Sequence, residues 1–220
     1  GSSAQLINGS SATNFYNLTI NESTSATTVT SQTTAFSVAN NLTVTQGNLI
    51  IQATDNNYTV TNNFIVSTNG TFTHSVNWDV AGRSLNIGGN VIIDGLFTYT
   101  VRSHVQMSGT NKTIRTGPLP SGFSILTLVN TAGTISANGL VTVNDNFWAA
   151  FNVNGGTFST NGQTVNANAS LLNSGGTILV NGGNLNITGG LQVGTGSLNG
   201  TMTISSGTVT TDGFTIGNGT

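Results

Sequence analysis

Asn41-Leu-Thr-Val44 returns along the chain in four variants: Asn17-Leu-Thr-Ile20, Asn63-Phe-Ile-Val66, Asn90-Val-Ile-Ile93 and Asn184-Leu-Asn-Ile187. In chain order the five phrases start 24, 22, 27 and 94 residues apart, and 94 is close to four further intervals of 23 or 24. A period in the low twenties is typical of one coil of a solenoid, which holds several short strands and their turns. The repeat therefore predicts a stack of rungs of roughly 20–27 residues.

The residues around the phrases favour short strands over helices. Apolar residues alternate with a period of two, as in Leu42/Val44 and Leu185/Ile187, and β-branched residues are common. Asn-Gly pairs recur between these runs, at places where a positive φ costs little. Asn-Gly is also a strong hairpin signal, so an antiparallel β-sandwich is the alternative fold. The near-constant interval favours the solenoid, which we expect to be one domain over residues 1–220.

The composition is low in charge, with 5% charged residues, a formal net charge of −2 and no cysteine among 220 residues. Asn, Thr, Ser and Gly make up more than half of the chain, so neutral side chains solvate its surface. Hydrophobic residues reach 36%, enough for a core, whereas disordered chains combine low hydrophobicity with high net charge. No apolar run is long enough for a transmembrane helix, and no segment is basic enough to predict nucleic-acid binding. The composition predicts an extracellular protein at a cell surface.

Three longer phrases resemble a known group of proteins. They are 15–21 (FYNLTIN), 38–44 (VANNLTV) and 178–190 (ILVNGGNLNITGG). They are similar to the Asn/Thr/Gly-rich repeats of bacterial surface adhesins, including filamentous-haemagglutinin and autotransporter-passenger β-helices. The resemblance implies a right-handed parallel β-helix, secretion to the surface, and a role in adhesion or in building a biofilm matrix.

One segment departs from the repeat. Residues 106–124 contain both prolines of the chain, Pro118 and Pro120. Proline cannot donate a hydrogen bond to a strand ladder and occurs at edges, bends and loops. We therefore expect an irregular loop excursion from the rod near 106–124.

The basic residues suggest one candidate site. All four lie in one third of the chain together with both histidines. A strip of this kind could bind an anionic glycan or the carboxylates of a partner through charge-assisted hydrogen bonds. The alternative interpretation is a few solvated charges balanced by Asp79 and Asp94. The residues of this candidate anionic-ligand strip are Arg83, Arg102, His104, Lys112 and Arg115.

Catalysis has weaker support, although many parallel β-helices degrade polysaccharides. Glycoside hydrolysis needs two carboxylates across the scissile bond, and the acidic residues occur singly along the chain. Asp55 and Asp79 are one rung interval apart, so an adjacent pair is the remaining possibility. We expect no enzyme activity, no cofactor and no metal site. Irregular Thr-x-Thr pairs leave ice binding as a minor alternative. Aromatic residues such as Phe64, Phe72, Trp78, Trp148 and Phe151 are expected in the core.

The sequence therefore predicts a structural or adhesive protein that forms a rod or filament by stacking rungs. Residues 208–220 still follow the repeat and show no cap. Uncapped strand edges invite pairing with another chain, so the expected partner is the protein itself, head to tail or within a longer array. Surface glycans are the other expected partner, and a glycan-binding module is the alternative function.

Overall fold

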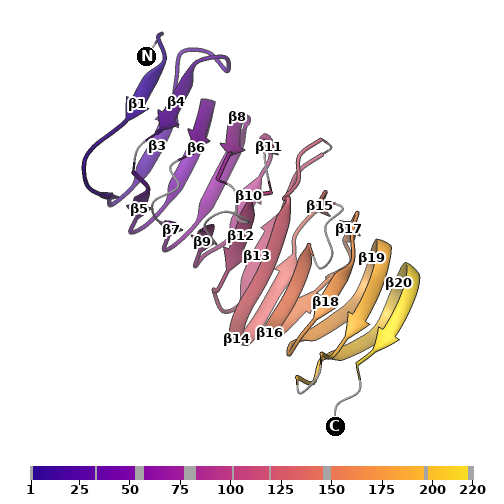
Figure 1. Cartoon of the computed structure of the whole chain (residues 1–220). Helices are drawn as coiled ribbons and strands as arrows, with labels where there is room; N and C mark the ends of the chain where they lie inside the picture. Colours follow the sequence, from indigo (N-terminus) through magenta and orange to yellow (C-terminus); the bar gives the residue numbers. More distant parts are fainter. Residues whose placement is uncertain are drawn as a thin grey trace.

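The computed structural model is a β-solenoid of about 8 turns, with 65% of the residues in strands and no helix among those described. It describes residues 2–32, 34–52, 57–76, 83–100, 102–118, 120–145, 150–195 and 198–217. The strands lie side by side along a rod, with the two termini at opposite ends (Figure 1). No described helix has the length and hydropathy to cross a membrane.

Each turn of the chain passes through three strand positions, which form three faces of the rod. Face A contains β1 (Gln5–Ile7), β4 (Thr28–Ser31), β11 (Leu96–Tyr99), β15 (Val141–Val143) and β17 (Thr164–Ala167). Face B contains β2 (Thr13–Phe15), β5 (Phe36–Val38), β7 (Tyr58–Val60), β9 (Ser84–Ile87), β12 (His104–Met107) and β18 (Leu171–Asn173). Face C contains β3 (Leu18–Asn21), β10 (Val91–Ile93) and β13 (Lys112–Arg115).

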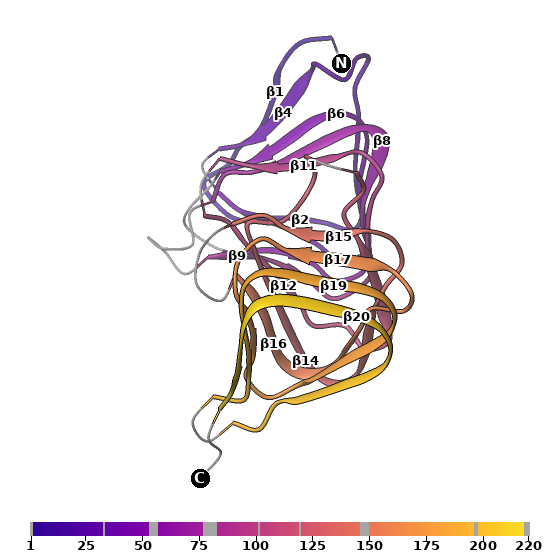
Figure 2. The ribbon, with the colours of Figure 1, turned by 90° about the vertical axis from the view of Figure 1, so that its right-hand side faces the viewer.

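The remaining strands bend around corners and contribute to more than one face. β6 (Leu42–Ile51) and β8 (Phe64–His74) run from face C to face A. β14 (Ile125–Ala137) and β16 (Phe151–Ser159) run from face B to face C. β19 (Thr177–Val193) and β20 (Thr201–Ile216) pass through faces C, A and B in turn. Figure 2 shows these long strands wrapping around the interior as closely spaced layers.

Every pairing between the described strands is parallel, and each strand pairs with strands of the neighbouring turns. Residues in register are 20–27 positions apart, from Phe158 with Ile178 to Phe64 with Val91. The one antiparallel contact among described residues is an isolated bridge between Thr195 and Leu198 in a corner. The predicted parallel solenoid and its rung length are therefore confirmed, and the antiparallel sandwich is wrong.

The interior is filled by alternate residues of each strand. In β6, Leu42, Val44, Leu49 and Ile51 are fully buried, while the residues between them, apart from the buried Gly47 at the bend, are half-buried or exposed. The aromatic residues Phe64, Phe72, Phe97 and Phe151 lie in this core, as expected. Their rings contact one another, for example Phe64 with Phe72 at 4.8 Å. Trp78 and Trp148 lie outside the described residues.

The repeated phrase marks the entry to face C. Its asparagines stack in successive rungs, and the amide oxygen of each one accepts the backbone N–H of the next. The N–H of Asn41 donates to Asn17 Oδ1 at 3.1 Å, that of Asn63 to Asn41 at 3.2 Å and that of Asn90 to Asn63 at 3.1 Å. The ladder therefore satisfies backbone donors at the corner where the strand pairing stops. Asn184 is an exception, because Asn184–Ile187 lies on face A beside Thr164–Ala167 and is not part of this ladder.

Glycine is required where corners stack most closely. Gly183 has φ +72°, and a Cβ there would lie 2.1 Å from the carbonyl oxygen of Gln163 in the turn below. Neither that conformation nor that separation accommodates an L side chain.

Part of the segment predicted to leave the rod, residues 106–124, lies inside it. Lys112–Arg115 form β13, which pairs with β10 and β14, and β12 continues to Met107. The residues that bulge outward are those after β13, where Pro118 and Pro120 are exposed. The chain rejoins the stack at Phe123, which bridges to Val143.

Candidate functional site

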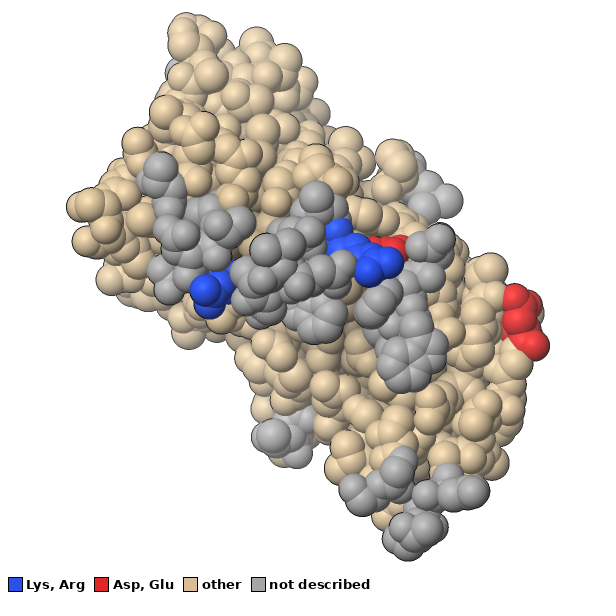
Figure 3. Space-filling model, in the orientation of Figure 1, with Lys and Arg blue, Asp and Glu red and all other residues tan. Residues whose placement is uncertain are grey.

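The predicted basic strip is divided between different parts of the rod. Arg83 and Arg102 lie at the corner that leads into face B, on successive rungs, because Ser84 is in register with His104. Lys112 and Arg115 lie at the two ends of β13 on face C. On the side of the molecule drawn in Figure 3, the basic side chains form two separate spots. The structure thus places Arg83 and Arg102 on successive rungs at one corner, and Lys112 and Arg115 on face C, so it does not build one strip with all five residues.

Arg115 already has an anionic partner. Its Nε and Nη2 donate to the two carboxylate oxygens of Asp94, both at 2.8 Å. Their side chains are 28% and 46% exposed. The hydrogen bonds from Arg115 lower the pKa of Asp94, and Asp94 in turn raises the pKa of Arg115. The positive charge of Arg115 is therefore largely neutralised. This agrees with the alternative interpretation of the strip, in which Asp94 balances a solvated basic residue. Asp79 lies outside the described residues.

His104 is not an exposed charge, which corrects its place in the strip. It is 8% exposed, and its Nε2 lies 2.8 Å from the hydroxyl of Thr127 in the next turn. Desolvation lowers its pKa to about 4, so its imidazole is neutral at pH 7. The simple in-and-out alternation fails here because His104 and Val105 are both buried at the corner.

His74 is a second buried histidine, and it points into the core. It is fully buried against Phe72 and Phe97, and neither ring nitrogen has a hydrogen-bond partner in the described structure. Desolvation first, and then the nearby His104, lower its pKa to about 3. Such a group weakens the fold at acid pH.

Glu22 and Asp94, two of the described carboxylates, do not form a hydrolytic pair. Glu22 and Asp94 share the corner between faces C and A but are three rungs apart, as Gln46 and Asn69 occupy the two rungs between them. Stacked strands are about 4.8 Å apart, so three rungs span about 14 Å. Glycosidases hold their carboxyl groups roughly 5–9.5 Å apart. Asp55 lies outside the described residues, and no group of three or more potential metal ligands occurs within them.

The threonine columns are also irregular. One column of stacked residues on the outer side of face A contains Ile50, Thr73 and Thr98 in successive turns. On the same face farther along the rod, two asparagines, Asn166 and Asn186, are stacked. A regular flat threonine array is therefore not built on this face.

The last described turn is the most unusual surface of the rod. β20 repeats the inward pattern of β19, but it pairs with β19 alone among the described strands. Its inward side chains therefore have no layer above them: Ile204 is 55%, Phe214 55% and Ile216 69% exposed. Apolar side chains that point toward the core, and the strand edge of β20 that no described strand pairs with, are therefore both exposed at this end of the rod.

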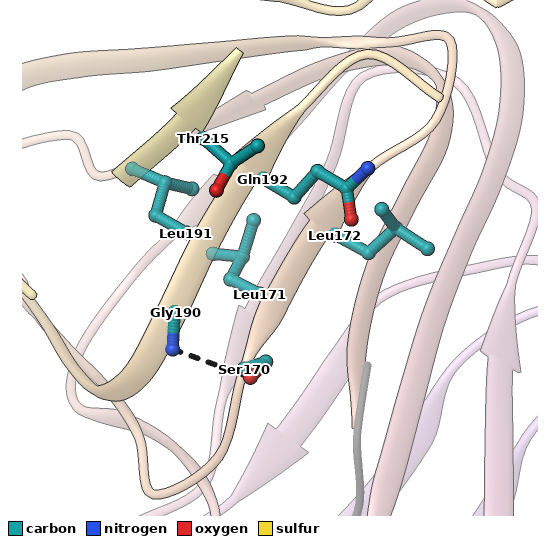
Figure 4. A pocket seen from close by; sticks show the side chains of 7 residues that line it. All are labelled: Ser170, Leu171, Leu172, Gly190, Leu191, Gln192 and Thr215. Carbon is teal, nitrogen blue, oxygen red and sulfur yellow. Dashed lines mark hydrogen bonds between the residues drawn. The ribbon is translucent and has the colours of Figure 1, made fainter. Parts of the chain in front are cut away.

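Two of the hollows on the sides of the rod are lined by described residues. The smaller one, of about 110 Å³, lies on face B near the last turns, between Ser170, Leu172, Gln192 and Thr215 (Figure 4). One wall is fixed by a 3.2 Å hydrogen bond from the N–H of Gly190 to Ser170 Oγ. Ligand pockets usually exceed about 300 Å³, so this hollow is too small for a ligand of that class.

The larger hollow, of about 410 Å³, lies at the corner between faces C and A. It crosses several turns, with Ser25 on one side and Pro118 and Pro120 on the other. The sequence did not identify it as a site. The signal for it is the length of the corners: the longer ones, 22–27 and 116–122, flank short ones in the turns between them.

No protein-family model, no curated protein sequence and no solved structure matches this chain.

Proposed function

We propose that this protein is an extracellular structural rod, which serves in surface adhesion or matrix building and is extended at the open turn β20 by a further rung. The observation that carries the proposal is the exposed apolar section formed by Ile204, Phe214 and Ile216. In a repeat fold each turn is stabilised by the next, and terminal turns need a polar cap for solubility. The end formed by β20 has an apolar inner face instead.

The order of the faces specifies which strand comes next. β20 ends on face B at Ile216, so the following position in the coil is on face C, over Thr201–Ile204. The first strand of the chain, β1, lies on face A. If β1 and β2 of a second copy covered the A and B segments of β20, the face C position would stay empty for one layer. Extension of the rod from β20 would therefore begin with a strand of face C.

We expect the same surface to promote association of the chain with itself. An open edge with an apolar inner face pairs readily with any extended segment. The low charge supports this, because only 5% of the residues could repel an approaching copy. A rod of this kind separates objects by its length and needs no catalytic group.

Adding one rung in phase tests the proposal. A second copy of residues 177–193 placed after Thr220 begins with a face C strand, 20 positions after Thr201, which is an interval that the rod already uses. We expect the amides of β20 to become protected from hydrogen exchange and the denaturation midpoint to rise. The control carries the same addition with lysine at its inward positions, and it should protect nothing.

The proposal is wrong if the amides of β20 exchange hydrogen as fast with the apolar rung as with the lysine control, because the exposed section then does not stack on an added rung. The surface location is tested separately: antibodies should label intact, unpermeabilised cells, and labelling that requires permeabilisation would refute it.

A further inference from the structure

We propose that the hollow between faces C and A binds a neutral saccharide. This inference does not depend on the open end, since the hollow lies on the side of the rod at the turns that contain Thr68, Asp94 and Pro118. Its volume of about 410 Å³ is in the range of small-molecule sites.

The two walls are held in place by the turns next to them. The corner 22–27 folds over Gly47, where a Cβ would lie 2.8 Å from the side chain of Glu22. The corner that contains Pro118 is anchored at Gly117, whose Cβ would lie 2.8 Å from the carbonyl oxygen of Ile93. Because both walls rest on neighbouring turns, the hollow is formed before any ligand arrives.

Closely stacked glycines form part of the floor. Gly70 and Gly95 both line the hollow. A Cβ on Gly95 would lie 2.3 Å from the carbonyl oxygen of Gly70, and one on Gly70 would lie 2.3 Å from that of Val44. These corners approach so closely that only glycine fits, so the floor is made of backbone from successive turns.

The chemistry of the lining suits hydroxyl groups on a carbon ring. Thr68 and Asn69 are exposed there, and neither side chain bonds to another described residue. Asp94 adds a carboxylate that stays ionised, because Arg115 lowers its pKa. Charged acceptors bind hydroxyls more strongly than neutral ones do. Leu96 and the two prolines supply apolar surface for the C–H side of a ring.

The hollow offers no unpaired cation to an anionic sugar. Its single charged lining residue is the carboxylate of Asp94. Arg115 is not among the lining residues, and its guanidinium is paired with Asp94 through two hydrogen bonds. A uronic acid would approach a carboxylate without a free cation among the lining residues. This distinguishes the site from the anionic-ligand strip that the sequence suggested.

Asn69 offers a matched pair of variants. Asn69-Gly70 and Asn138-Gly139 are both exposed Asn-Gly corners between faces C and A, but only the first lines the hollow. The purified chain is titrated with a panel of neutral oligosaccharides of three to five units and with uronic-acid oligosaccharides of equal length. Circular dichroism confirms that each variant is folded.

We expect at least one neutral oligosaccharide to bind. Asn69→Ala should weaken it about 5-fold and Asp94→Asn about 10-fold, from the loss of a neutral and a charged hydrogen bond respectively. Asn138→Ala should bind like the parent. The proposal is overturned if no neutral oligosaccharide binds, if uronic-acid oligosaccharides bind more tightly, or if the two asparagine variants behave alike. None of these results affects the protection of β20, so the rod is tested independently.

Discussion

The buried histidines make the stability of this protein depend on pH in a range where little else titrates. His74 and His104 have pKa values of about 3 and about 4 in the folded chain, against about 6.5 when unfolded. Between these values the unfolded chain binds more protons than the folded chain. Stability therefore falls as the pH is lowered below about 6.5, and it continues to fall until the folded histidines titrate.

The size of the effect at pH 5 follows from the unfolded pKa. pH 5 lies about 1.5 units below the pKa of each histidine in the unfolded chain. At 1.36 kcal/mol per unit, protonation in the unfolded chain therefore lowers the free energy of unfolding by about 2 kcal/mol per histidine. The two histidines together should lower the free energy of unfolding by about 4 kcal/mol. Carboxyl groups ordinarily titrate near pH 4 and number only six, so they contribute little between pH 7 and pH 5.

Urea unfolding followed by circular dichroism at pH 7 and pH 5 measures this loss. His74→Leu should halve it to about 2 kcal/mol, and the double variant with His104→Leu should nearly abolish it. The reasoning is wrong if the parent loses less than about 1 kcal/mol, or if the parent and the double variant lose the same amount.

Three further predictions concern the fold. Gly183→Ala should cost at least about 2 kcal/mol of unfolding free energy, because its φ is positive and the carbonyl of the turn below is in contact. The Cβ added by Gly213→Ala meets no atom within 4 Å, so this variant should keep the stability of the parent. Equal melting temperatures for the Gly183→Ala and Gly213→Ala variants would contradict this account. Asn63→Ala should cost about 0.5–1.5 kcal/mol in urea unfolding because it removes the acceptor of the partly buried backbone N–H of Asn90, whereas an equal cost for the exposed Asn138→Ala would refute the ladder. Arg115→Ser should lower the free energy of unfolding by less than about 1 kcal/mol, as for other exposed ion pairs. A fall in melting temperature that corresponds to a larger loss would contradict this.

The phrase with asparagine predicted the stack because it performs the same task in each turn. Asn17, Asn41, Asn63 and Asn90 all cap the entry to face C, so their spacing is the length of a turn. Asn184 has the same neighbours in sequence but lies on face A. Any strand entry can use an asparagine, and the phrase does not encode which face follows it.

The candidate sites were harder to predict than the fold. Simple alternation would place His104 outside if Val105 points inward, but a residue at a corner can be buried next to another buried residue, as His104 is beside Val105. The partnership of Arg115 with Asp94 depends on the register of neighbouring turns, which varies from 20 to 27 residues. The hollow depends on unequal corner lengths, and these become visible only when the turns are aligned in space.

Electron cryotomography of the native cell surface, with antibody against this chain, tests the central claim most directly. The account predicts labelled rods outside the cell whose layers repeat every 4.8 Å or so along the axis and continue past the turn that contains Phe214. Labelled particles that end at that turn as separate globular units, or labelling inside the cell, would contradict it.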